Sequence, residues 1–283
     1  MNLPQVLPVL AADPLVEEAA ARAFSDLAEK WFAGKMARDD LLAAVDRLGF
    51  ADASPAADRE AWLAAAAIIR AQARSAAPID MALLLATGDR AGAIAHDPES
   101  YACAAAAPAP GSADALAALS LGRCLQIGAS MEAALELSLR YVQDRRQFGQ
   151  ALARFQAIQH SLALAAEEVA ACTAIADLAL ACAAREGIAS ARLPALLDAA
   201  ALVAAHGVDV VYDVCHQVHG AIGFTQEYAL HRHSLDLLRW RDHLQLLRGG
   251  DIGCAERLGN AALAAGSAWR AVTMAMKPGE VHE

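Results

Sequence analysis

Apolar residues recur along this chain at intervals of three and four, which is the spacing of one face of an amphipathic helix. Asp13 and Pro14 are typical of a helix start, and Gly49 is typical of a helix end. No segment alternates apolar and polar residues as a half-buried strand does. The pattern therefore predicts four helices in the N-terminal part, over residues 13–31, 39–48, 58–75 and 78–88.

The same spacing continues over longer stretches beyond residue 113, with short connections that favour antiparallel neighbours in a bundle. Between the two helical parts, prolines and glycine interrupt the pattern, as in a linker. The sequence thus predicts an all-α protein with an N-terminal helical domain (1–92), a linker (93–113) and a C-terminal four-helix-bundle domain (114–283). The C-terminal helices are expected over residues 115–143, 153–186, 191–218, 225–247 and 252–276.

Composition supports the helical prediction. The chain has 283 residues, of which 74 are alanine and only 5% are aromatic. Alanine is the best helix former and a poor strand residue. The formal net charge of −10 argues against nucleic-acid binding, which needs a basic face.

The distribution of charged residues predicts no membrane partner. The longest stretch without Asp, Glu, Lys or Arg, residues 100–113, contains two prolines and is shorter than the roughly 20 apolar residues of a spanning helix. The first residues carry no positive charge, so no signal peptide is expected. Six dispersed cysteines without a C-x-x-C pair indicate reduced side chains in a cytoplasmic protein.

Two segments carry candidate chemistry. The first reads Y-V-Q-D-R-R-Q-F-G over residues 141–149 and continues as R-F-Q-A-I-Q-H over 154–160. The second reads Q-V-H-G-A-I-G-F-T-Q-E-Y over residues 217–228. Arginine suits phosphate, and glycines permit a close backbone approach. Taken singly, the first segment is better explained as a basic helix C-terminus and the second as an ordinary turn between helices.

Together, the two segments resemble the acyl-CoA dehydrogenase family in its C-terminal helical domain, over about residues 115–247. The resemblance implies that Arg145 contacts the pyrophosphate of an FAD in the neighbouring subunit. It implies that Phe148 and Gln156 help to hold the adenosine half of FAD. Gln217 and Gly220 would line the same diphosphate channel.

The chain departs from the family at three points. Ala221 stands where the family has a second glycine, and its methyl group would crowd the phosphates. The family places a glutamate base at one of two positions, which correspond here to Leu244 and to residues 119–121, and neither holds a carboxylate. Relatives also carry a β-domain between the helical parts, and residues 93–113 are too few for one.

Asp242 and Asp251 are the acids nearest the first base position, and both are weak candidates for the base. Asp251 is also explained as a helix N-cap. No metal site is predicted, because the pairs His216 with His219 and His231 with His233 lack further ligands at suitable spacing.

Three hypotheses follow. In the first, the chain is a subunit that contributes the adenosine and pyrophosphate side of an FAD site, in a heteromeric enzyme that α,β-desaturates an acyl-CoA with a family partner. In the second, it is an autonomous minimal dehydrogenase, alone or as a self-oligomer, that uses Asp251 or Asp242 as base. In the third, it is a non-enzymatic helical scaffold that has lost FAD.

Overall fold

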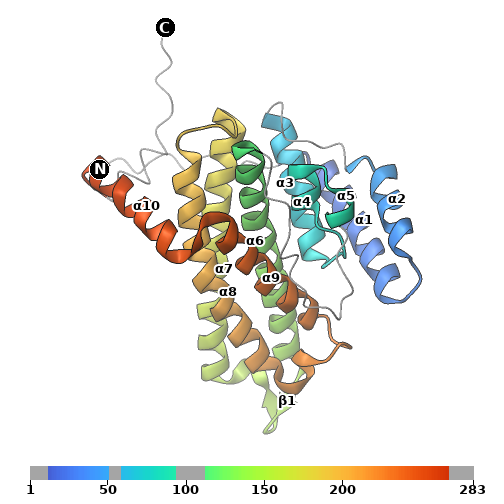
Figure 1. Cartoon of the computed structure of the whole chain (residues 1–283). Helices are drawn as coiled ribbons and strands as arrows, with labels where there is room; N and C mark the ends of the chain where they lie inside the picture. The colour runs from blue at the N-terminus through green and yellow to red at the C-terminus, as the bar shows by residue number, and fades with distance from the viewer. Residues whose placement is uncertain (1–11, 51–58, 94–111, 268–283) are drawn as a thin grey trace.

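The computed structural model describes residues 12–50, 59–93 and 112–267 (Figure 1). It is a helical protein, and the only strands among these residues form one short hairpin. The all-α prediction is therefore confirmed. The linker predicted over residues 93–113 lies almost entirely outside the described residues.

The described residues of the N-terminal part form the helices α1 (Pro14–Phe32), α2 (Arg38–Arg47), α3 (Arg59–Arg74), α4 (Met81–Thr87) and α5 (Arg90–Ala93). Helix α1 starts as predicted, because the Asp13 side chain accepts a hydrogen bond from the Leu15 N–H at 2.9 Å. Helix α4 ends at Gly88, which has a φ of 71°.

The C-terminal part contains α6 (Ala113–Asp144), α7 (Gln156–Glu186), α8 (Leu193–His219), α9 (Leu230–Arg248) and α10 (Gly250–Ala265). Helices α6 to α9 form the predicted antiparallel bundle (Figure 1). The last helix ends at Ala265 with Gly266 at a φ of 69°, so the prediction that it continues to residue 276 was wrong.

Helix α6 is the centre of the molecule. It packs against α7, α8 and α9 on the bundle side and against α3 and α4 on the N-terminal side. One continuous apolar core includes side chains from both parts, such as Phe24 of α1 and Leu121 of α6. The boundaries 1–92, 93–113 and 114–283 remain a prediction.

Helix α8 with the turn after it is apolar and long enough to cross a membrane by length and composition. Half of that apolar stretch is buried inside the protein, where α8 packs against α6, α7 and α9. These contacts explain its composition as that of a core helix. Five of the six cysteines are within the described residues and are buried free thiols, as predicted.

Candidate functional site at the hairpin end of the bundle

A short hairpin joins α6 to α7 at one end of the bundle (Figure 1). Its strands are β1 (Arg146–Gln147) and β2 (Gln150–Ala151), and a 3-10 turn, η2 (Leu152–Arg154), leads into α7. The two residues between the strands, Phe148 and Gly149, both have positive φ, at 52° and 82°. Such a conformation favours glycine and costs a bulky residue about 1–2 kcal/mol.

Phe148 is also 90% exposed, so burial of its ring does not offset this strain. Its ring contacts the Phe155 ring edge to face, at 6.2 Å between centroids. A strained, solvent-exposed aromatic residue at a hairpin tip indicates a functional position rather than a packing one.

The hairpin end is basic in a chain whose net charge is −10. Arg145, Arg146 and Arg154 are all exposed, and within the described part of the chain their guanidinium groups have no ion-pair or hydrogen-bond partner. Arg145 caps α6, with its backbone N–H donating to the Tyr141 carbonyl at 2.8 Å. These side chains are free to bind an anion from outside the chain.

The second predicted segment lies at the same end. Helix α8 ends at His219, and Gly220, with a φ of 64°, starts the 3-10 turn η3 (Gly220–Phe224). Tyr141 of α6 stacks on His219 at 4.4 Å, and its hydroxyl donates to the His219 carbonyl at 3.5 Å. The ends of α6 and α8 therefore lie side by side.

The structure thus places all five predicted cofactor-binding residues at one end of the bundle, each of them exposed to solvent. No atom lies within 4 Å of where a Cβ on Gly220 would be, so this turn is open. Unpaired guanidinium groups and an open glycine turn fit a diphosphate. The five residues are Arg145, Phe148, Gln156, Gln217 and Gly220.

Two aromatic stacks behind this surface were missed by the sequence analysis. In the first, the His219 ring contacts Tyr141 at 4.4 Å and Tyr228 at 4.9 Å, and the two tyrosine rings contact each other edge to face at 6.1 Å. In the second, the His216 ring stacks on Phe224 at 4.1 Å and makes a tilted contact with Tyr212 at 4.4 Å. The histidines in the motif were considered only as metal ligands, although their spacing of three places both on the inner side of α8.

Hydrogen bonds fix the orientation of both histidines. The His219 Nδ1–H donates to the Cys215 carbonyl at 2.7 Å, and its Nε2 accepts from the Tyr228 hydroxyl at 3.2 Å. Burial lowers the pKa of His219 and of His216, so both rings are held neutral. The described residues contain no group of three or more His, Cys, Asp or Glu side chains suited to a metal ion.

The two positions where the family carries its base are in the core. Leu119, Leu121 and Leu244 are each completely buried. Asp242 is exposed and paired with Arg241 at 2.8 Å. Asp251 is exposed in the first turn of α10, where Gly249 and not Asp251 is the N-cap. Both acids lie at least three helical turns beyond the start of α9, away from the hairpin.

A buried polar network between α4, α6 and α9 also escaped prediction. The Arg123 guanidinium, 2% exposed, donates to both oxygens of Asp80 at 2.6–2.7 Å and to the Gln126 side chain at 2.6 Å. Its Nε–H donates to His243 Nδ1 at 3.0 Å. Burial opposes ionisation of Asp80, but Arg123 outweighs it and holds the pKa of that carboxyl below its usual value.

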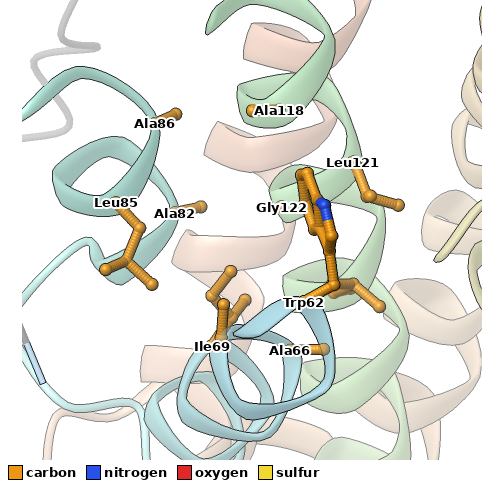
Figure 2. Close-up of a pocket in the computed structure, with 11 residues that line it drawn as sticks. Trp62, Ala66, Ile69, Ala82, Leu85, Ala86, Ala118, Leu121 and Gly122 are labelled. Carbon is orange, nitrogen blue, oxygen red and sulfur yellow. The ribbon is translucent and has the colours of Figure 1, made fainter. Parts of the chain in front are cut away.

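An apolar pocket lies between α3, α4 and α6 (Figure 2). Gly122 lets α4 and α6 approach closely there, because a Cβ on it would lie 2.6 Å from the Ala82 Cβ. No charged side chain lines the pocket. Its larger lining residues are Trp62, Ile69, Leu85, Leu121 and Leu125.

Comparison with known proteins identifies the C-terminal part. Residues 111–241 match the family model described as acyl-CoA dehydrogenase, C-terminal domain. These residues are therefore similar to the C-terminal domain of the acyl-CoA dehydrogenase family. The chain is also 36% identical over 124 residues to the acyl-CoA dehydrogenase IpdE2 of Mycobacterium tuberculosis, a match that covers 44% of this chain. That match spans 35% of the relative, so the chain accounts for about a third of the curated protein's length.

Two solved structures share the fold of nearly the whole chain. One is a chain of the ChsE4-ChsE5 complex from Mycobacterium tuberculosis, with a TM-score of 0.67 and 14% identity over 93% of this chain and 99% of that one. The other is a chain of a Tcur3481-Tcur3483 steroid ACAD variant, with a TM-score of 0.67 and 18% identity over 89% and 98%. The helical fold of this chain is therefore shared, over nearly their whole length, by chains of these two complexes.

Proposed function

We propose that this chain is a subunit of a heteromeric acyl-CoA dehydrogenase and supplies the adenosine and pyrophosphate side of an FAD site. The observation that carries the proposal is the unpaired basic end of the bundle: Arg145 lies exposed at the same end as the strained Phe148 and the open turn at Gly220. FAD, when bound, accepts the hydride in this family. The residues at the hairpin end would hold and orient its diphosphate.

The residues at the base positions support a heteromer rather than an autonomous enzyme. Leu119, Leu121 and Leu244 are buried core residues, so this chain offers no carboxylate where the family has its base. A partner with a β-domain and a glutamate base would supply both. The steroid ACAD and the ChsE4-ChsE5 complex are named as assemblies, which makes a two-protein enzyme with a short subunit a reasonable precedent.

The test is co-expression of the chain with an acyl-CoA dehydrogenase encoded beside it, followed by measurement of flavin per subunit and of acyl-CoA desaturation. We expect flavin and turnover in the complex, and a loss of flavin with Arg145→Ala. A matched control is Arg22→Ala, which removes an exposed arginine from α1. If the chain alone binds flavin and desaturates an acyl-CoA, the heteromer proposal fails.

The other two hypotheses give different results in the same assay. For an autonomous enzyme, Asp251→Asn or Asp242→Asn would abolish the activity of the isolated chain. For a scaffold that has lost FAD, Arg145→Ala would leave the flavin content and turnover of the complex unchanged. A cytoplasmic location remains an expectation from the sequence.

A further inference from the structure

Arg232, in the first turn of α9, is half-buried and has no counter-charge within the described part of the chain. Its Cζ lies 3.5 Å from the centroid of the Phe32 ring, at the end of α1. Its guanidinium makes no ion pair or hydrogen bond with a described residue. Every other arginine that is buried or half-buried in the described ranges is ion-paired to a carboxylate: Arg70, Arg123, Arg192, Arg239, Arg241 and Arg248. Arg232 is the exception to this pairing.

Acidic residues on the same helix do not neutralise Arg232. The first turn of α9 contains no acidic side chain, and Asp236, one turn further on, is paired with Arg239 at 3.3 Å. Burial lowers the pKa of Arg232, because no carboxylate beside it offsets the loss of water around the charge. A partly buried charge without a partner is unfavourable. The fold therefore leaves here a positive charge that a ligand from outside the chain can neutralise.

The Phe32 ring holds the guanidinium in place. The ring is itself partly buried against the apolar core, and the attraction between the arginine charge and the ring face keeps the side chain on it. The Arg232 Nε is buried and has no hydrogen-bond partner, so the two terminal Nη groups form the part of the side chain that is open to solvent. A ligand thus meets a guanidinium that is already ordered and loses little further freedom on binding.

The exposed end of this guanidinium suits a carboxylate. Its Nη groups present N–H donors in a planar fork that matches the two oxygens of a carboxylate. A carboxylate carries one negative charge, which balances the single unpaired charge of Arg232. A phosphate monoester carries about two negative charges near neutral pH and would add to the net charge of −10 on this chain.

We propose that Arg232, held on the Phe32 ring, is a binding site for a single carboxylate group. The carboxylate belongs either to a small molecule or to an acidic side chain of another chain, and the two sources give different results in the same experiment. The site uses none of the residues proposed to bind FAD. It therefore stands or falls independently of the proposed function.

The experiment follows the NMR signal of the Arg232 Nε–H, identified by its absence in Arg232→Lys, while the full chain is titrated with sodium acetate. Sodium chloride at the same ionic strength is the control titration. The signal should move with acetate until it saturates, and chloride should not move it. Phe32→Leu should weaken acetate binding about fivefold, whereas Phe32→Tyr, which keeps the ring, should bind as wild type. Arg22→Lys, which changes an exposed arginine on α1, should leave the titration unchanged.

The same titration on the co-expressed complex identifies the source of the carboxylate. If an acidic side chain of the partner occupies the site, acetate no longer moves the signal in the complex, and Arg232→Leu weakens subunit association. If the ligand is a small molecule, acetate still moves the signal and Arg232→Leu leaves association unchanged. The proposal is overturned if acetate does not move the Arg232 signal of the isolated chain, if chloride moves it equally, or if the signals of all exposed arginines move alike. None of these outcomes depends on flavin content, which tests the proposed function.

Discussion

Two polar regions of this protein are built in opposite ways. At the hairpin end, Arg145 and its neighbours are exposed and unpaired, and Phe148 is strained. Between α4, α6 and α9, Arg123 is buried and hydrogen bonded to Asp80, Gln126 and His243. An exposed polar group without a partner is available to a ligand, whereas a buried polar group with its hydrogen bonds made contributes to stability.

The same contrast in exposure separates the residues expected to bind the cofactor from the positions expected to hold the catalytic base. The residues proposed for the cofactor side are exposed, whereas the residues at the expected base positions, Leu119, Leu121 and Leu244, are buried. A catalytic role is therefore expected only in combination with another chain. Mutations in the buried network should lower stability, whereas mutations at the hairpin end should weaken ligand binding and leave stability nearly unchanged. The following predictions test that contrast, from the largest effect to the smallest.

Removing the buried arginine should have the largest effect on stability. Arg123→Met leaves the Asp80 carboxylate buried without its counter-charge, which should lower the free energy of unfolding by about 3–5 kcal/mol. Urea denaturation followed by circular dichroism measures this. Arg145→Ala is the matched control and should change stability by less than about 0.5 kcal/mol. Equal effects of the two variants would contradict the contrast.

Acid should destabilise the chain through buried histidines. Burial lowers the pKa of His233 and His243 from 6.5 to about 4, so below pH 6.5 the unfolded chain binds protons that the folded chain does not. Burial raises the pKa of Asp236 from 3.8 to about 6, which works in the opposite direction and offsets part of the loss. Stability should therefore fall by on the order of 2 kcal/mol between pH 7 and pH 5.

The pH effect is checked by urea midpoints at the two pH values. His233→Gln, which can keep a hydrogen bond to Ser130, should reduce the pH dependence. A stability that is flat or rises on acidification would show that Asp236 dominates.

The close approach at Gly223 should be sensitive to a single methyl group. Gly223→Ala forces a shift of the neighbouring side chains and should cost about 1–3 kcal/mol, with loss of the Phe224 stack. Gly259 of α10 has nothing within 4 Å of the equivalent position. Gly259→Ala should therefore stabilise the helix by about 0.4–1 kcal/mol. Thermal unfolding of both variants decides whether the turn is as tight as described.

Relieving the strain at the hairpin tip should be mildly stabilising and functionally harmful. Phe148→Asn replaces an aromatic residue with one that tolerates positive φ, which should add about 0.5–1 kcal/mol of stability. The same change should lower the flavin content of the co-expressed complex. If flavin content is unaffected, Phe148 takes no part in binding.

The helices were predictable from the sequence because they depend on local order, whereas the cofactor role of the two motifs stays a prediction. Spacing, caps and glycines gave the starts of α1 and α7 within a few residues. The linker and the domain boundaries were also inferred from local composition, and they remain predictions. The end of α10 at Ala265 was missed, because Gly266, with a φ of 69°, ends the helix within an alanine-rich stretch.

The tertiary polar network was not predictable. Arg123 is 43 residues from Asp80 and 120 from His243, and no periodicity signals such a pairing. The stack of Phe224 on His216 likewise depends on the close approach at Gly223. Contacts of this kind join residues that are far apart in the sequence. They depend on how the helices pack, and local sequence patterns do not reveal that packing.

The central claim is that the hairpin end of this chain completes an FAD site with another subunit. Flavin content per subunit, measured by absorbance on the purified co-expressed complex and on the chain alone, tests it most directly. We predict flavin in the complex, loss of flavin with Arg145→Ala, and none in the isolated chain. A complex that keeps full flavin with Arg145→Ala would contradict the account.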